Sequence, residues 1–187
     1  MNQQINNRIL FLYSSTDGQT VAIVQKMIDH LGGQVQVDVL DSAENKAVNL
    51  HQYQMIVIAA SIRYGKFNTR LNHFIKMHAS ELNAMKSAFF GVNLIARKPE
   101  KRTAQTNVYV RKFLARSPWK PTLCEVFAGA LLYSRYTWYD KAMIQLIMKI
   151  TGGQTDTSKD VIYTDWQQVE DCTRKLLVLL KENNQTI

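Results

Sequence analysis

The sequence predicts an α/β protein in which a parallel sheet carries helices on both faces. Short apolar runs of strand length alternate along the chain with amphipathic segments of helical spacing. One run, QMIVIAAS at residues 54–61, is almost continuously apolar, as expected of a strand covered on both faces. Repeated alternation of this kind is typical of parallel strands joined by helical crossovers. With 187 residues, of which 46% are hydrophobic, the chain suits a single domain over residues 1–187.

Two further strands and a helix precede that buried run. Residues 8–13 form a short apolar strand. A helix over residues 21–31 is predicted by apolar residues at helical spacing, and two glycines at 32 and 33 end it. The segment QVQVDVL at residues 34–40 alternates cleanly, which predicts a half-buried strand at an edge of the sheet.

The second half of the chain continues the alternation. Helices are predicted at residues 69–82 and 106–117, the latter stopping before Pro118, and a final helix at residues 166–182. Strands are predicted at residues 87–95 and 124–132, with a short one at residues 160–165. Residues 132–160 then form an insert between the last two strand segments.

Composition excludes several classes of protein. Cys124 and Cys172 are far apart and form no CxxC or Cys–His pattern, so neither a disulfide framework nor a metal site is expected. The N-terminal MNQQINNRIL lacks the apolar segment of a signal peptide, and no apolar run is long enough to cross a bilayer. We therefore expect a chain that is neither secreted nor transmembrane, in a reducing cytoplasm.

The net charge of +8 is concentrated in one segment. Residues 86–122 hold nine Lys or Arg and one acid, whereas the rest of the chain carries fourteen residues of each sign. Such a field attracts anions, with nucleic acid, anionic lipid and a small carboxylate as candidates, although a solvated face would show the same pattern.

Three polar loops leave the carboxyl ends of the predicted strands, where open α/β sheets bind ligands. They are SSTDGQT at residues 14–20, SIRYGKF at 61–67 and NLIARKPEKRT at 93–103. The first joins hydroxyl residues and a glycine to a helix N-terminus, a combination that favours a phosphate, although plain helix capping also explains it. The loop has neither a Walker lysine nor a GxGxxG pattern, so nucleoside triphosphate and NAD are poorly supported.

Residues 15–20 resemble the FMN phosphate loop of flavodoxins. The order of strands and helices is similar to that fold too, which implies a doubly wound five-stranded parallel sheet of order 2-1-3-4-5, with a long insert interrupting the last strand. Asp17 departs from the pattern, because a hydroxyl is usual there and a carboxylate repels a phosphate. We expect Asp17 to face outward or to cap the following helix.

A sharper resemblance rests on ASIRYG, VNLIARKPEKRT, RKFL, AGAL, WYDK, MIQLIMK, GG and YTDW, which occur in this order within residues 8–182. Together these segments are similar to the menaquinone-dependent protoporphyrinogen IX dehydrogenases of bacterial haem biosynthesis, a family of flavodoxin-like FMN enzymes. The resemblance implies dehydrogenation of protoporphyrinogen IX to protoporphyrin IX, with flavin N5 accepting a hydride and a membrane quinone, menaquinone or ubiquinone, taking the electrons.

The resemblance also implies which residues hold the FMN. The three loops contribute Ser14, Ser15, Thr16, Asp17, Gly18, Gln19, Thr20, Ser61, Ile62, Arg63, Tyr64, Gly65, Asn93, Leu94, Ile95 and Ala96. Tyr64 is expected to stack on one face of the isoalloxazine, while the absence of an aromatic in NLIARKP leaves the other face open for substrate. Arg63 is placed either at the N1 and O2 edge of the flavin or in solvent.

Protoporphyrinogen carries two propionates on a large apolar ring, so its site needs cations beside an apolar surface. Arg97, Lys98, Lys101 and Arg102 follow the fourth strand and are the expected substrate-binding residues. No general base is evident, because His30, His51, His73 and His78 fall in or near helical segments away from the three loops.

The insert has an apolar helix preceded by aromatic residues. Such a composition suits an interfacial helix at an anionic membrane, which would place the protein on the cytoplasmic face of the inner membrane, near its quinone. The expected membrane or quinone contacts are Tyr136, Trp138, Tyr139, Ile144, Ile147 and Met148. Packing onto the domain itself or onto a second copy in a homo-oligomer explains the same pattern.

Three other functions share part of these features. A flavodoxin-like NAD(P)H:quinone reductase and an electron-transfer flavodoxin would share the fold and the FMN, although ordinary flavodoxins are acidic. A nucleic-acid-binding module would use the basic segment alone. We expect no nucleic-acid partner, because the phosphate loop and the later motifs would then have no purpose.

Overall fold

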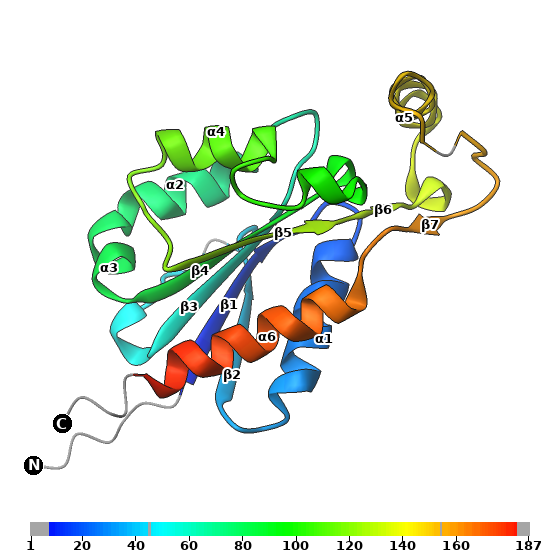
Figure 1. Ribbon diagram of the computed structural model, residues 1–187. Coiled ribbons are helices and arrows are strands. Elements are labelled where there is room, and N and C mark those ends of the chain that lie inside the picture. Colours follow the sequence, from blue (N-terminus) through cyan, green and yellow to red (C-terminus); the bar gives the residue numbers. More distant parts are fainter. Residues whose placement is uncertain (1–7, 45, 154, 183–187) are drawn as a thin grey trace, which may run out of the picture.

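A computed structural model describes residues 8–44, 46–153 and 155–182, and its centre is a parallel sheet (Figure 1). The sheet has five strands in the order β2-β1-β3-β4-β5. Their bounds are β1 Arg8–Ser14, β2 Gln36–Asp41, β3 Met55–Ser61, β4 Lys86–Asn93 and β5 Leu123–Ala128. The predicted fold class and strand order are confirmed, and the alternating segment forms the edge strand β2, as expected.

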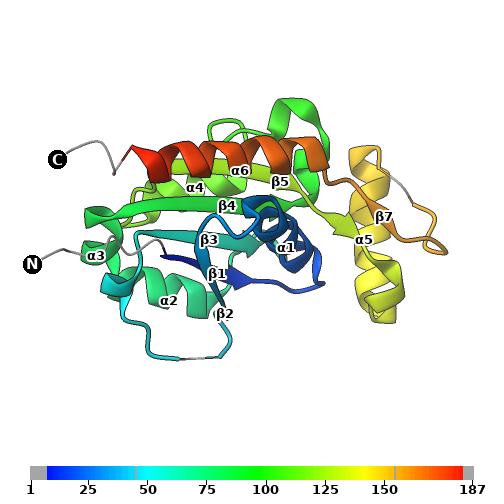
Figure 2. The ribbon, with the colours of Figure 1, turned by 90° about the horizontal axis from the view of Figure 1, so that it is seen from below.

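Helices cover both faces of the sheet (Figures 1 and 2). α1 (Gln19–Leu31) and α6 (Trp166–Lys181) lie on one face. α2 (Thr69–Met77), α3 (Ala79–Ala84) and α4 (Val108–Arg116) lie on the other. Short 3-10 turns occupy Leu50–Gln52, Leu94–Arg97 and Pro99–Lys101.

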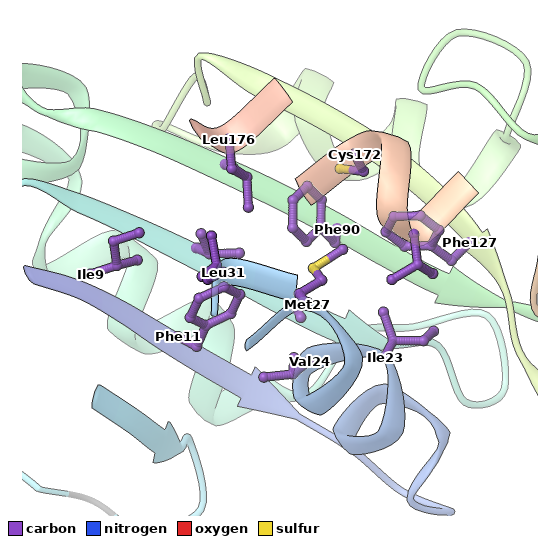
Figure 3. Packing of buried hydrophobic residues seen from close by; sticks show 14 of the residues in the cluster. Ile9, Phe11, Ile23, Val24, Met27, Leu31, Phe90, Phe127, Cys172 and Leu176 are labelled. Carbon is purple, nitrogen blue, oxygen red and sulfur yellow. The ribbon is translucent and has the colours of Figure 1, made fainter. Parts of the chain in front are cut away.

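The apolar spacing of the two long helices explains where the core forms. Met27 of α1 and Leu176 of α6 are fully buried and pack in one cluster with Phe11 and Phe90 of the strands beneath them (Figure 3). β3 is buried over its apolar length, which accounts for its lack of alternation. The sheet is therefore held between two apolar layers, and it in turn positions the loops at its carboxyl end.

Several predicted elements have different ends, and the strand expected over residues 160–165 is reduced to Val161–Ile162. The helix expected over residues 69–82 is broken at His78, whose ψ of 17° is not helical and whose N–H closes α2 on Phe74. The strand expected to reach residue 95 stops at Asn93, because the Asn93 side chain accepts from the Ala96 N–H at 3.2 Å and begins a turn. The strand expected over 124–132 divides at Gly129 into β5 and the short β6 (Ala130–Leu131).

The insert forms a separate small unit at the carboxyl end of the sheet. β6 pairs antiparallel with β7 (Val161–Ile162), and between them lie a 3-10 turn (Tyr133–Arg135) and α5 (Trp138–Thr151). Its apolar cluster is buried around Leu131, Tyr133, Tyr136 and Met148. Figures 1 and 2 show α5 beyond the end of the sheet rather than on either face. The insert thus follows the part of the last strand that pairs with β4.

We predict that Gly91→Ala destabilises the protein. Gly91 lies in β4, and a Cβ atom there would be 2.5 Å from Cγ2 of Val110, a buried β-branched side chain of α4 with little freedom to move. Overpacking of this kind costs about 1–3 kcal/mol, which urea unfolding measures. Gly129→Ala is the matched control, because its Cβ would meet Val92 at an ordinary 3.5 Å. Equal losses in the two variants would contradict the prediction.

Candidate functional site

A cavity of about 190 Å³ lies where the three predicted loops meet. The loops leave the carboxyl ends of β1, β3 and β4, and the order of the sheet places β1 directly beside β3. Chain connections diverge to opposite faces between these two strands, which is where open α/β sheets bind ligands. The insert adds a further wall through Tyr136, Ile144 and Ile147.

Most of the residues expected to hold a cofactor line this cavity. They are Ser15, Asp17, Gln19, Thr20, Ser61, Ile62, Arg63, Tyr64, Gly65, Asn93, Leu94 and Ile95. Ser14, Thr16, Gly18 and Ala96 belong to the same loops but do not line it. Four lining residues were not foreseen, namely Val92, Tyr109, Gly129 and Ala130.

The first loop is shaped by a left-handed glycine. Gly18 has φ 95° and its N–H donates to Ser15 Oγ at 3.0 Å, which turns the chain into α1. Gln19 is fixed from a distant segment, because its Nε2 donates to Thr164 Oγ1 at 2.8 Å. Thr20 is fully buried, yet its hydroxyl has no partner among the described residues. The loop therefore presents an unmet polar group at a helix N-terminus.

The second loop is a tight turn with a strained residue at its tip. Arg63 and Lys66 exchange backbone hydrogen bonds at 3.1 Å in both directions. Tyr64 has φ 50°, in the region that favours glycine, and its ring is 57% exposed. Strain of this kind persists only where neighbouring contacts hold it, and it is concentrated at functional sites.

One guanidinium links the first two loops to the insert. Arg63 contacts the Asp17 carboxylate at 3.3 Å and the Asp140 carboxylate at 2.9 Å. The Tyr64 hydroxyl donates to Asp140, and Thr137 Oγ1 donates to the same carboxylate at 2.7 Å. These bonds, those from Tyr64 and Thr137 first, lower the pKa of Asp140 below its ordinary value despite burial.

The expectation that Asp17 faces outward or caps α1 is wrong. The N-cap of α1 is Gly18, with no side-chain cap. The Asp17 carboxylate instead accepts hydrogen bonds from Arg63 and, at 3.2 Å, from the Tyr136 hydroxyl. Burial, together with the charge of Asp17, raises the pKa of Tyr136 to about 12, so this hydroxyl remains a donor at neutral pH.

The third loop contributes amides rather than cations to the cavity. Asn93 is buried with Nδ2 unpartnered among the described residues, while its Oδ1 accepts from Ala96 N and from Asn107 Nδ2. Tyr109, in the first turn of α4, supplies the aromatic ring that the loop itself lacks. The sequence could have indicated this residue, because Tyr109 is an aromatic residue in the first turn of the helix that follows the loop.

The four cations expected to bind substrate do not line the cavity. Arg102 is engaged elsewhere, since it donates to the Ala96 carbonyl at 3.1 Å and pairs with Asp165 at 3.2 Å. Arg97 is half-buried and donates to the Leu94 carbonyl. Lys98 and Lys101 are exposed beyond the cavity rim.

The insert residues fall into two groups. Met148 is fully buried in the small apolar cluster, so a membrane contact is wrong for it. Tyr136 belongs to the same cluster and lines the cavity, so a contact with quinone stays a prediction for it. Ile144 and Ile147 line the cavity, and Trp138 and Tyr139 are exposed.

The polar groups of the cavity fit a flavin with a phosphate tail. Thr20 Oγ1 and Asn93 Nδ2 are both buried without partners and both belong to lining residues, and α1 offers free N–H groups at its start. Leu94, Ile95 and Ile144 provide the apolar surface that a flat ring requires.

Comparison with known proteins assigns the chain to a family. A model of the flavodoxin domain matches residues 10–158. Protoporphyrinogen IX dehydrogenase (quinone) of Escherichia coli K12 is 50% identical over 172 residues, covering 90% of this chain and 94% of that protein. The chain belongs to this family. A member from Leishmania major is 49% identical over 164 residues, 87% of this chain and 71% of that protein. The resemblance drawn from the sequence motifs is thereby confirmed.

Solved structures show the same fold as this member of the dehydrogenase family. A flavodoxin from the domain Archaea has a TM-score of 0.54 at 15% identity, covering 93% of this chain and 99% of that one. Rubredoxin oxygen:oxidoreductase of Desulfovibrio gigas has a TM-score of 0.53 at 8% identity, over 96% of this chain and 37% of that one. At these identities the likeness establishes the flavodoxin-like fold and nothing further.

The described residues of this family member contain neither a metal-binding cluster nor a helix that could cross a membrane. Within residues 8–44, 46–153 and 155–182, no three His, Cys, Asp or Glu side chains gather as a metal-binding group. None of the helices in these ranges is both long enough and apolar enough to cross a bilayer.

We predict that Asp140→Asn lowers the free energy of unfolding in a pH-dependent way. The carboxylate has a depressed pKa in the folded state, so its contribution is present above the ordinary Asp pKa of about 3.9 and is lost as pH falls through the folded value. The difference from wild type should be constant between about pH 5 and 8 and shrink below about pH 4. Urea unfolding across this range measures it.

Asp29→Asn is the control for this experiment. Asp29 is a surface carboxylate of α1 that accepts only a local hydrogen bond from Gln25 at 2.9 Å. A difference for Asp140→Asn that persists unchanged at pH 3.5 would contradict the assigned role of its charge.

Proposed function

We propose that this chain catalyses FMN-dependent dehydrogenation of protoporphyrinogen IX to protoporphyrin IX, with a membrane quinone, menaquinone or ubiquinone, as the electron acceptor in haem biosynthesis. The observation that carries the proposal is the cavity at the β1–β3 switch point, in a member of this dehydrogenase family. Its unpartnered Thr20 and Asn93 groups support FMN in particular, because the former lies at a helix N-terminus that suits a phosphate.

The chain's own residues would hold and orient the flavin. Thr20, Ser15 and the first N–H groups of α1 receive the phosphate end, and Asn93 offers an amide to a polar edge of the ring. Tyr64 and Tyr109 lie at the cavity as aromatic partners for the ring. When bound, FMN supplies hydride acceptance at N5 and one- or two-electron transfer to a quinone.

Arg63 is the cation among the described residues that line the cavity. It lines the cavity and is held by Asp17 and Asp140, so its position is set before any ligand enters. A fixed cation stabilises negative charge that develops on a reduced ring, at no cost in reorganisation. Ile144 and Ile147 line the same space and add apolar surface to it.

The substrate is larger than the cavity, so part of it must extend beyond the rim. A propionate there would meet the exposed Lys98 and Lys101, which follow the third loop. Arg97 can contribute from the same turn, whereas Arg102 is tied to Asp165 and is therefore a weaker candidate than expected from the sequence. None of the four histidines lines the cavity, so we assign no histidine as a base.

α5 connects the cavity to a surface suited to a membrane. Ile144 and Ile147 face the cavity, while Trp138 and Ile150 are 82% and 75% exposed, with Leu146 and Tyr139 also exposed. An exposed apolar helix with lysines beside it is typical of interfacial binding to anionic lipid. We place the protein on the cytoplasmic face of the inner membrane, where a quinone could reach the cavity along α5.

The function is tested by anaerobic mixing of the FMN-loaded protein with protoporphyrinogen IX. We expect loss of the absorbance of oxidised flavin, appearance of protoporphyrin IX, and recovery of the flavin absorbance when a soluble quinone is added. A correctly folded, FMN-loaded protein that shows no flavin reduction by protoporphyrinogen would contradict the proposal. Rapid reduction by NADPH instead would identify an NAD(P)H:quinone reductase, and a slow response to both donors would fit an electron-transfer flavodoxin.

The membrane contact is tested by vesicle sedimentation with phosphatidylglycerol-containing liposomes. Replacing Leu146 and Ile150 by Glu removes two exposed apolar side chains and adds charge of the wrong sign, so binding should fall at least about tenfold. Val178→Glu is the control, because Val178 is an apolar residue of α6 that is about as exposed as Leu146. Unchanged binding would contradict the proposal, and a dimer in solution that the double variant dissociates would show that α5 contacts a second copy.

A further inference from the structure

Arg135 belongs to the insert but lies on the first loop. Its Nη1 donates a hydrogen bond to the backbone carbonyl of Asp17. A Cβ atom built on Gly18 would lie 2.6 Å from the same nitrogen, so the guanidinium rests against the residue that caps α1. The N-terminus of a helix is its positive end and disfavours a cation. The bond to the Asp17 carbonyl holds the guanidinium at this helix end, where an anion bound beside it would offset the repulsion.

The backbone that carries Arg135 is held in place by its neighbours. Ser134 donates to Asp160 twice, from its N–H at 3.0 Å and from its hydroxyl at 2.6 Å. The Arg135 N–H donates to Leu132 at 2.9 Å, and the next residue, Tyr136, is buried with its hydroxyl on Asp17. The position of the guanidinium over the loop thus follows from the fold of the insert.

The loop beneath Arg135 has polar groups prepared for an anion. Thr20 is fully buried, lines the cavity, and has a hydroxyl without a partner in the described part of the chain. α1 is 13 residues long, with no acidic residue in its first turn and no side-chain cap on its N–H groups. Burying a hydroxyl without a hydrogen-bond partner costs free energy, so a ligand that accepts its hydrogen bond gains affinity.

The carboxylates near Arg135 are already bonded by other donors. Asp17 accepts from Arg63 and Tyr136, and Asp160 accepts from Ser134. The bonds from Ser134, with a smaller contribution from the charge of Arg135, lower the pKa of Asp160. Arg63 is shared between Asp17 and Asp140, whereas Arg135 bonds the backbone of the first loop directly. In this arrangement the positive charge of Arg135 offsets the repulsion that the Asp17 carboxylate would exert on a phosphate.

We propose that Arg135 binds the FMN phosphate, so that the insert closes over the phosphate end of the cofactor as well as over its ring. The proposal rests on the proposed FMN function and adds to it a residue that lies outside the three strand-end loops. A guanidinium offers two parallel hydrogen bonds to phosphate oxygens, which makes the contact specific for FMN over riboflavin.

Titration of flavin-free protein with FMN and with riboflavin, followed by flavin fluorescence, tests this. Arg135→Gln should raise the Kd for FMN by about ten- to a hundredfold, the range expected for a charge-assisted hydrogen bond, and leave the Kd for riboflavin unchanged. Arg135→Lys should show a smaller rise. Added salt should weaken FMN binding in wild type more than in Arg135→Gln. Lys159→Gln, an exposed cation of the same insert, is the matched control and should change neither Kd.

Thr20→Val separates failure of this inference from failure of the FMN assignment, because it removes the loop's own phosphate donor. If Thr20→Val loses the preference for FMN and Arg135→Gln keeps it, the Arg135 proposal is overturned while the phosphate site stands. Equal losses for both flavins in Arg135→Gln also overturn it, since they indicate a purely structural role. If wild type itself does not prefer FMN over riboflavin, both the inference and the assignment of FMN fail.

Discussion

The ion pairs of Arg63 with Asp17 and Asp140 hold together three parts of the chain that the sheet alone would leave apart. The cation follows β3, one carboxylate follows β1, and the other begins α5. Asp140 is only 4% exposed, so its charge is stable there because Arg63, Tyr64 and Thr137 surround it. If one partner were removed, a partly desolvated charge would remain beside the cavity, which costs far more than the loss of a surface ion pair. The insert is thus positioned over the site by charge and hydrogen bonds, together with a small apolar cluster against which Leu94 of the third loop packs.

The sheet and its two helical layers could be predicted from the sequence, because apolar spacing directly reports which face is buried. The apolar run of β3, the alternation of β2 and the helical spacing of α1 all have local causes. The break at His78 could not be predicted, since apolar spacing continues through it and Leu82 is buried on the far side. The break depends on packing against the sheet, which a local pattern does not contain.

The site was predictable to the level of its loops. Parallel strands bring their carboxyl ends to one edge, so three loops far apart in sequence had to meet there. The direction of Asp17 was not predictable, although the argument that a carboxylate avoids a phosphate was sound. Its partners lie 46 and 119 positions away along the chain, and only the folded insert brings Tyr136 to it. Met148 was misjudged for a related reason, because a helix that is apolar on most sides does not reveal which side its own small cluster covers.

The short stem of β6 and β7 has a consequence for folding. Two residue pairs, together with a bond from the Tyr163 N–H to the Gly129 carbonyl at 3.1 Å, close a segment of about 30 residues outside the register of the main sheet. The five strands of the main sheet pair with one another, whereas the insert contacts the loops after β1 and β3 through Arg135, Tyr136 and Asp140. It is consequently a candidate for a separate unit of low local stability, one that opens and recloses while the core stays folded. The contacts that hold the insert against the loops after β1 and β3 can therefore also control the access of a large flat substrate to the cavity.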